Sequence, residues 1–400
     1  MMNAQKTLNC VVDEFARPHL SWRRNTWPSY RVFGCSGLGC AIVVVELLAA
    51  LHGLSQWVMA EIIVAAVMTF PSLVMITKII TGEEHIVYYH HEIAVVLVTA
   101  LLLLVLRQPI SPYLDLTIVG VGTFLAFGRV GCFMVGCCHG RPSSWGVCYR
   151  QEHAEVGFTP YYIGVRLFPV QLVESLWVLV TVIVSSYFVV IGSQPGSALA
   201  WYVVSYDIGR FFFEFLRGDP GRPYLCGFSQ PQWISVILLW CVGAAELEGT
   251  LPLHRWHLAA AAALTLAMIA IALRRGLDRT DLFNLVHPRH VREIAEFVNP
   301  INAATEALAN CRWTVLAKPA STQRIRLACT SLGVRVSASA MRFAGEQVEH
   351  FAVSRPDRGM CEQAARSLAV IILNLRRSKR GGQFLKGNDG VFHVLIRQTA

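Results

Sequence analysis

Residues 168–191 read FPVQLVESLWVLVTVIVSSYFVVI, with a single charged side chain, that of Glu174. A membrane-crossing helix needs about 20 predominantly apolar residues to traverse roughly 30 Å of hydrocarbon. This run therefore predicts a transmembrane helix. Further apolar runs occur at residues 34–52, 57–80, 93–106, 114–135, 198–216, 232–247 and 256–273.

Three of these runs are less clear than the others. The run 93–106 is short unless its helix extends back through His90 and His91, and the runs 198–216 and 232–247 are marginally apolar. We therefore expect an all-α polytopic membrane protein with seven or eight transmembrane helices, followed by a small C-terminal α+β soluble domain.

The composition agrees with a membrane protein. Of the 400 residues, 54% are hydrophobic and 15% are charged, whereas about a quarter of the residues in a soluble domain are charged. Intrinsic disorder, a collagen-like fibre and a small disulfide-stapled scaffold are excluded. Residues 1–31 are polar and lack the apolar segment of a signal peptide, so we expect the first membrane helix to direct insertion.

The C-terminal part has a different pattern. Beyond residue 278 no run is long enough to cross a membrane. Alternating stretches within 321–337 and 341–353 predict strands, 361–377 predicts an amphipathic helix, and 391–396 predicts a final strand. We thus divide the chain into a polar segment (1–31), a transmembrane domain (32–278) and a basic soluble domain (279–400).

The positive charge of the chain is concentrated in this last part. Residues 284–400 contain 17 Lys and Arg against 8 Asp and Glu, a net charge equal to the +9 of the whole chain. Each basic residue near an anionic membrane surface contributes about 1 kcal/mol of attraction. We expect the domain to meet such a surface, and no motif indicates nucleic-acid binding.

Ionisable residues inside membrane segments are costly, so each marks a candidate functional position. The first group is Tyr88-Tyr89-His90-His91-Glu92, which begins the third apolar segment. A histidine there can serve as an acid, a base or a phosphate partner. Interfacial anchoring of the tyrosines and histidines at headgroup depth is the alternative.

The second group lies in residues 128–141, GRVGCFMVGCCHGR. Its glycines permit close backbone approach and sharp turns, and Arg129 suits a phosphate partner because guanidinium groups bind phosphate in a bidentate manner. A purely structural glycine-rich turn is an alternative. A metal site is another, although Cys-x4-Cys-Cys-His is not a usual zinc spacing.

Two further groups contain carboxylates. Gln171 and Glu174 share one helical face, where Glu174 is suited either to accept from a distant arginine or to contribute to helix capping. Residues 207–217 read DIGRFFFEFLR, which places Arg210, Glu214 and Arg217 along one face. These residues indicate either a structural ion pair or a site for an anionic headgroup.

Taken in order, these groups resemble the motifs of the prolipoprotein diacylglyceryl transferase family. The first half of the family's Tyr/Phe-His-Gly-Gly is echoed by Tyr89-His90, and its Gly-Arg-x-Gly-Asn-Phe-x-x-Gly-Glu is echoed by residues 128–137. Its His-Pro-x-Gln-Leu-Tyr-Glu is echoed by 168–174, and its Arg-Phe-x-x-Glu-Phe-x-Arg is matched by 210–217. Each motif is modest alone, but the ordered set, spanning roughly residues 30–250, is specific.

The resemblance implies an enzyme of the bacterial inner membrane without a metal or cofactor. Such enzymes move the diacylglyceryl group of phosphatidylglycerol to the thiol of a lipobox cysteine in a prolipoprotein and release glycerol phosphate. Arginines would stabilise the charge on the departing phosphate, and a base would help to form the attacking thiolate. The implied catalytic residues are His90, Arg129, Arg210 and Glu214, and the implied substrate-binding residues are Gly128, Cys132, Gly136, Cys137, Gly140, Gln171, Glu174 and Arg217.

Several residues depart from the family pattern. Cys132 stands where the family has Asn, Cys137 where it has Glu, and His91-Glu92 where it has Gly-Gly; Phe33 stands at a family tyrosine. These changes point to a divergent member and call the identity of the acceptor into question. The alternative is a non-enzymatic lipid-binding or metal- or redox-sensing protein on the same fold, suggested by the cysteines and His139.

Overall fold

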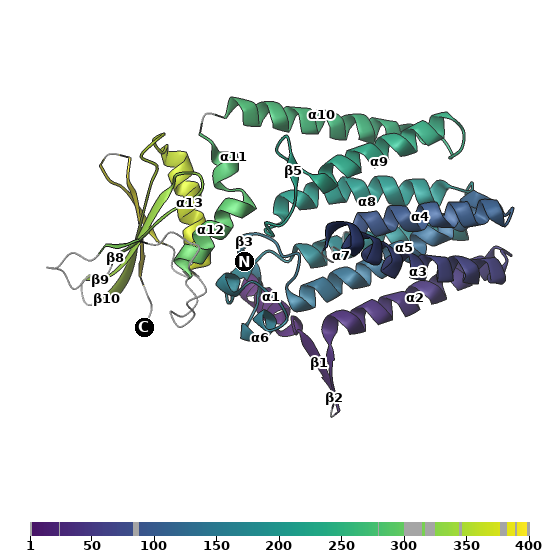
Figure 1. Ribbon diagram of the computed structural model, residues 1–400, viewed down its shortest axis with the longest axis horizontal. Helices are drawn as coiled ribbons and strands as arrows, with labels where there is room; N and C mark the ends of the chain where they lie inside the picture. The colour runs from purple at the N-terminus through teal and green to yellow at the C-terminus, as the bar shows by residue number, and fades with distance from the viewer. Residues whose placement is uncertain are drawn as a thin grey trace.

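The computed structural model describes residues 2–23, 25–82, 88–278, 280–299, 314–316, 325–343, 346–376, 382–388 and 390–397. Figure 1 shows long helices lying side by side along the long axis of the molecule, with a β-sheet beyond one end of the bundle. The long helices of the described chain are α2 (Ser29–Leu51), α3 (Gln56–Thr81), α4 (Tyr88–Val105), α5 (Ile110–Val135), α7 (Val170–Val190), α8 (Ser197–Leu216), α9 (Gln230–Leu247) and α10 (Arg255–Leu277).

These helices coincide with the eight predicted apolar runs, so the prediction of a multi-pass membrane protein is confirmed. Six described helices are long and apolar enough to cross a membrane, namely α2, α3, α4, α5, α7 and α10. The predicted seven or eight spans are consistent with this finding. Helix α4 does extend back through His90 and His91, and it begins at Tyr88.

Helix α5 forms the centre of the bundle and packs against α2, α4, α7 and α8. The close approach of α5 to α7 and α8 depends on Gly122. A Cβ atom at this position would lie 2.4 Å from the ring of Tyr202 on α8 and 2.6 Å from Val182 on α7. At the end of the bundle far from the sheet, the Asp115 carboxylate accepts the backbone N–H groups of Gly196 and Leu199, both at 2.7 Å. Asp115 thereby connects α5 to the start of α8.

Short elements gather at the opposite end of the bundle (Figure 1). Helix α1 is held there by an ion pair between Arg166 and Asp13, with a closest N–O distance of 2.9 Å. This end is also where α5 ends and where α7 begins. The short elements are α1 (Met2–Phe15), β1 (His19–Trp22), β2 (Asn25–Pro28), β3 (Pro142–Cys148), α6 (Gln151–Ala154), the 3-10 helix η1 (Pro160–Tyr162), β4 (Arg166–Leu167), β5 (Tyr224–Leu225) and β6 (Phe228–Ser229).

The C-terminal part is a six-stranded antiparallel sheet with strand order β11-β12-β10-β9-β8-β7, packed against α13. The predicted strands, amphipathic helix and final strand are confirmed where they are described; residues 321–324, 344–345 and 377 lie outside the described chain. The elements are α11 (Leu282–Leu285), α12 (Pro288–Val298), β7 (Thr314–Leu316), β8 (Ile325–Cys329), β9 (Arg335–Phe343), β10 (Glu346–Ser354), α13 (Glu362–Leu375), β11 (Gln383–Lys386) and β12 (Phe392–Arg397).

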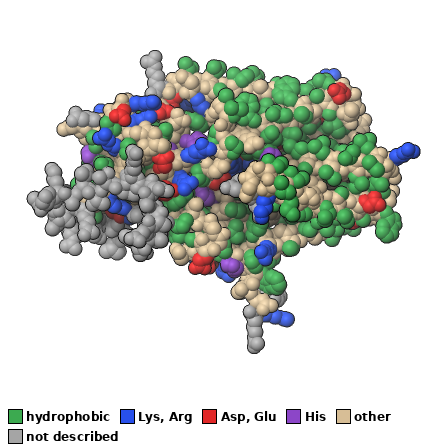
Figure 2. Space-filling view, in the orientation of Figure 1, with side chains coloured by type: hydrophobic (Ala, Val, Ile, Leu, Met, Phe, Trp, Pro, Cys, Tyr) green, Lys and Arg blue, Asp and Glu red, His purple; other side chains and the backbone are tan. Residues whose placement is uncertain are grey.

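The C-terminal part packs directly on the loops at the end of the helical bundle. Phe297 and Leu368 share a hydrophobic core with Tyr149 and Tyr162 of the loop that follows α5. Arg289 donates to the carbonyl oxygen of Arg222 at 2.6 Å. Figure 2 shows apolar side chains covering the bundle, whereas charged side chains gather toward the end nearest this contact.

Candidate active site

Four arginines meet where α5, α7 and α8 approach the looped end of the bundle. Arg129 lies near the end of α5, Arg210 lies on α8, and Arg217 is the residue that caps the end of α8. Arg222 follows in the loop before β5. All four side chains are largely shielded from solvent, with exposed fractions of 8%, 9%, 3% and 15% respectively.

Glu174 organises three of these arginines from the first turns of α7. Its Oε1 atom lies 3.1 Å from Arg129 Nη2 and 3.8 Å from Arg210 Nε. Its Oε2 atom lies 4.0 Å from Arg217 Nη1. Tyr206 donates its hydroxyl to Oε1 at 3.3 Å. One carboxylate thus counters three guanidinium groups, and the proposal that Glu174 accepts from an arginine elsewhere in the bundle fits this arrangement.

Two more carboxylates complete the network. Glu214 Oε1 lies 2.5 Å from Arg210 Nη1, one helical turn away, and also contacts Arg222. Asp219 binds Arg217 in a bidentate manner at 2.9 and 3.2 Å, and it lies 3.4 Å from Arg222 Nη2. The groups in direct contact are therefore four guanidinium ions and three carboxylates, an excess of one positive charge.

This excess makes the cluster suitable for an anion. Buried charges are tolerated only when they are paired and hydrogen-bonded. Burial, with a smaller contribution from the nearby charge of Arg210, lowers the pKa of Arg222 to about 9, so a further negative charge beside it would stabilise its cationic form. A phosphate would supply that charge, and arginine binds phosphate with matching bidentate geometry.

The turn that follows α5 is connected to the arginine network through α7 and α8. Gln171 Nε2 donates to the carbonyl of Cys137 at 2.8 Å, and Gly140 forms an antiparallel bridge with Arg217. A Cβ atom on Gly140 would lie 2.3 Å from the carbonyl oxygen of Phe168. The chain can therefore pass between the two helices only with glycine at this position.

The other two glycines singled out by the sequence differ from each other. Gly136 ends α5 in the left-handed conformation, with φ of 81°, and a Cβ there would lie 2.7 Å from the Phe158 ring. A Cβ on Gly128 would meet no atom within 4 Å. Gly136 is thus needed for the turn, whereas Gly128 faces open space.

His90 stands apart from the arginines. Its side chain is exposed near the start of α4, and its ring packs edge-on against Tyr89 with 4.5 Å between the ring centroids. Within the described chain, no hydrogen bond or ion pair connects His90 to Arg129 or Arg210. The neighbouring His91 is buried and stacks on Phe70 at 4.7 Å. The catalytic role of His90 stays a prediction.

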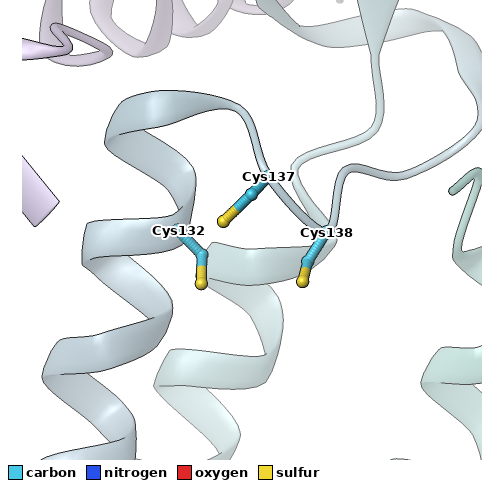
Figure 3. A group of neighbouring side chains, drawn as sticks. All are labelled: Cys132, Cys137 and Cys138. Carbon is cyan, nitrogen blue, oxygen red and sulfur yellow. The ribbon is translucent and has the colours of Figure 1, made fainter. Parts of the chain in front are cut away.

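The cysteines of the turn come together without the histidine. The metal-ligand atoms of Cys132, Cys137 and Cys138 all lie within 4.8 Å of one another (Figure 3). His139 Nδ1 instead donates to the carbonyl of Gly140 at 2.9 Å, and burial lowers the pKa of this imidazole. Among the described residues, the one other group of metal-ligating side chains is Glu246, His254 and His257, at the far end of the bundle between α9 and α10.

Three members of the network were not singled out in the sequence. Tyr206 lies one residue before the DIGRFFFEFLR stretch, and Asp219 and Arg222 lie just after it. Tyr206 is four residues before Arg210, so helical spacing could have indicated it. Asp219 and Arg222 lie in a loop, where sequence spacing does not define which side chains meet.

Comparison with known proteins supports the motif resemblance. Residues 84–247 match the family described as prolipoprotein diacylglyceryl transferase. Phosphatidylglycerol–prolipoprotein diacylglyceryl transferase 2 of Clostridium perfringens is 32% identical over 127 residues, covering 31% of this chain and 47% of that protein. The transferase of Clostridium tetani is 32% identical over 128 residues, covering 32% and 49%. Transferase 2 of Streptomyces coelicolor is 29% identical over 140 residues, covering 33% and 41%.

The chain thus spans about half the length of the curated relatives that it matches. All three are named as transferases, which does not favour the non-enzymatic alternative. The matched segment contains Arg129, Glu174 and Arg210, which form the centre of the network. The resemblance read from the ordered motifs is thereby confirmed for residues 84–247, which are similar to prolipoprotein diacylglyceryl transferases.

Proposed function

We propose that this protein is a membrane-embedded transferase that moves the diacylglyceryl group of phosphatidylglycerol to a cysteine thiol of a prolipoprotein, or to a related acceptor, and releases glycerol phosphate. The proposal is carried by the buried cluster of Arg129, Arg210, Arg217 and Arg222, which has one positive charge in excess of its carboxylates. The phosphate of a membrane lipid is an anion that can reach this buried cluster from the bilayer.

The chemistry requires stabilisation of a leaving group. The acceptor sulfur attacks the glyceryl carbon, and the bond from this carbon to the phosphate oxygen breaks. The electron pair of that bond leaves with glycerol phosphate. Donors aimed at the oxygen on which charge develops lower the barrier, and removal of one such donor typically costs about 100- to 1000-fold in rate. Arg129 and Arg210 would be these donors, with Glu214 orienting Arg210 at 2.5 Å.

The apolar part of the lipid also has a matching space. A cavity of about 240 Å³ lies between α2, α3, α4 and α5, and its lining includes Val45, Ile62 and Phe124. Phe124 is five residues before Arg129 on the same helix, so the cavity and the arginines are connected along α5. We propose that it accepts part of an acyl chain while the headgroup binds at the arginines.

The proposed roles of the remaining residues follow from their positions. His90 is exposed near the start of α4, where it would accept the proton of an incoming acceptor thiol, because a free thiol with a pKa of about 8.5 is mostly protonated at neutral pH. Gln171, Gly136 and Gly140 would support the turn that places Cys137 beside Cys132 and the lipid.

We further propose that the protein resides in the bacterial inner membrane and that residues 279–400 form a separate basic domain facing an anionic membrane surface. The net charge of +9 in residues 284–400 supports this assignment. Arg289, which donates to the carbonyl of Arg222, would connect this domain to the arginine cluster.

The test is turnover by the purified full-length protein in vesicles of labelled phosphatidylglycerol with a lipobox peptide. Mass spectrometry should detect a diacylglyceryl peptide together with an equal amount of released glycerol phosphate. Arg210→Ala should reduce turnover about 100-fold or more, whereas Arg366→Ala, which removes an exposed arginine of α13, should leave turnover unchanged. Normal turnover in Arg210→Ala, or no transfer by the wild-type protein to any thiol peptide, would overturn the proposal.

A further inference from the structure

The three cysteines at the end of α5 form a compact group of sulfur atoms. Cys132 lies on the last turn of the helix, and Cys137 and Cys138 lie on the turn that follows (Figure 3). Their ligand atoms are all within 4.8 Å of one another. A tetrahedral zinc ion with Zn–S bonds of about 2.3 Å separates its sulfurs by roughly 3.8 Å. A small contraction of the group would therefore enclose such an ion.

The backbone is bent in a way that brings these sulfurs together. Gly136 has φ of 81°, and Cys138 has φ of 54° although it is not a glycine. A left-handed conformation at a residue with a side chain is strained and is concentrated at functional sites. This pair of left-handed residues explains how the unusual spacing Cys-x4-Cys-Cys still produces a convergent group.

The surroundings suit three thiolates. Arg129 and Arg217 both lie within electrostatic range of Cys138, and Arg129 is also within range of Cys132. Nearby positive charge stabilises the thiolate form of a cysteine, which is the form that binds a metal. Cys132 is buried but Cys137 is exposed, so the group is open on one side.

We propose that Cys132, Cys137 and Cys138 form a three-thiolate zinc site whose open fourth position takes the thiol of the acceptor. Soft thiolate ligands favour zinc among the common divalent metals, and a site with three protein ligands leaves a position for substrate. Binding of Zn²⁺ releases the three cysteine protons. Binding of the acceptor thiol releases a fourth, because a thiol that coordinates zinc is deprotonated.

The role of the fourth position rests on the proposed function. The zinc-bound acceptor thiolate would attack the glyceryl carbon, the carbon–oxygen bond would break, and glycerol phosphate would leave with the bonding electrons beside Arg129 and Arg210. The thioether product is neutral and a weaker ligand than a thiolate, so it would leave the zinc. Two of the three ligands, Cys132 and Cys137, stand at the positions where the sequence departs from the family motif.

The first experiment measures metal. The full-length protein, purified without chelators under reducing conditions, should contain about one zinc per chain. Cys132→Ser, Cys137→Ser and Cys138→Ser should each lose most of it. Cys241→Ser removes an exposed thiol of α9, and His254→Ala disrupts the other group of metal-ligating residues; both should retain the zinc.

Cobalt substitution provides a readout independent of activity. The wild-type protein loaded with Co²⁺ should show thiolate-to-cobalt charge-transfer absorption that is absent in Cys138→Ser. This absorption should change when a lipobox peptide is added, but not when its cysteine is replaced by serine. The zinc site is overturned if all three cysteine variants retain zinc. It is also overturned if two of the cysteines form a disulfide, or if the bound metal is copper. An unchanged cobalt spectrum with the peptide would overturn the role of the fourth position.

The outcomes also separate this inference from the proposed function. Stoichiometric zinc held by the three cysteines, without transfer from any phospholipid, would reject the proposed function but keep the metal site. Undiminished transfer of the diacylglyceryl group by zinc-free protein would keep the function and reject the role of the fourth position.

Discussion

Glu174→Gln tests the central feature of the arginine network. The Glu174 carboxylate contacts three guanidinium groups at 3.1, 3.8 and 4.0 Å. At an effective dielectric constant of about 20, two unit charges 4 Å apart interact by about 4 kcal/mol. The gross attraction is therefore roughly 12 kcal/mol, and desolvation of the carboxylate offsets a large part of it.

Loss of one partner of a buried ion pair costs about 3–5 kcal/mol. We expect Glu174→Gln to fall at the upper end of this range, because it leaves three cations without their shared counter-ion. Denaturant titration in detergent micelles would measure the free energy of unfolding. Glu362→Gln is the matched control, because Glu362 is an exposed carboxylate paired with Arg366 at 2.7 Å, and its loss should cost less than about 1 kcal/mol.

An added anion should partly replace the missing charge. In the wild-type protein a phosphate competes with Glu174 for the arginines, whereas in Glu174→Gln it does not. Phosphatidylglycerol in the micelles should therefore raise the unfolding free energy of the variant more than that of the wild-type protein. Phosphatidylcholine, whose headgroup has no net charge, should stabilise the variant less than phosphatidylglycerol does. The reasoning is refuted if the variant unfolds within about 1 kcal/mol of the wild-type protein, or if phosphatidylglycerol stabilises both equally.

Three other predictions concern separate parts of the molecule. Gly140→Ala places a Cβ 2.3 Å from a carbonyl oxygen, so we expect a loss of about 1–3 kcal/mol in stability and reduced turnover, whereas Gly128→Ala, which meets nothing within 4 Å, should leave the unfolding free energy unchanged. His257→Ala leaves the buried carboxylate of Glu246 without the imidazole that lies 2.5 Å away; its unfolding free energy should fall by about 1–3 kcal/mol, the cost of leaving a buried hydrogen-bonding group without its partner, and an unchanged value would show that the hydrogen bond is not formed. Burial and neighbouring arginines lower the pKa of His287 to about 4. The unfolded chain therefore binds the proton more readily, and stability should be complete above about pH 6.5 and decline as the pH falls toward 4; thermal unfolding across this range should be less pH-dependent in His287→Asn.

Most of the helical architecture could be predicted from local sequence. Apolar runs of sufficient length predicted each of the eight long helices, because the transfer of apolar side chains from water to hydrocarbon depends on composition rather than on partners. Alternation likewise predicted the strands of the C-terminal sheet. The spacing of four residues also predicted that Arg210 and Glu214 share one helical face. In the structure Arg210 Nη1 lies 2.5 Å from Glu214 Oε1.

The convergence of the site could not be predicted in the same way. Glu174 is 45 residues from Arg129 in the sequence, and their contact depends on how α5 packs against α7. Arg222 and Asp219 join the network from a loop whose course depends on the elements around it. In the sequence His139 looked equivalent to its cysteine neighbours, yet beyond the left-handed turn at Cys138 its ring binds the carbonyl oxygen of Gly140 and does not join the three sulfurs.

The order of residues alone determined which segments enter the membrane and which ionisable groups enter with them, since both depend on the chemistry of each segment by itself. The packing of the helices decided that one carboxylate is shared by three arginines and that three sulfurs meet beside them. The physical reason is that Coulomb interactions and ligand geometry depend on distances between atoms, and these distances exist only once the helices have packed.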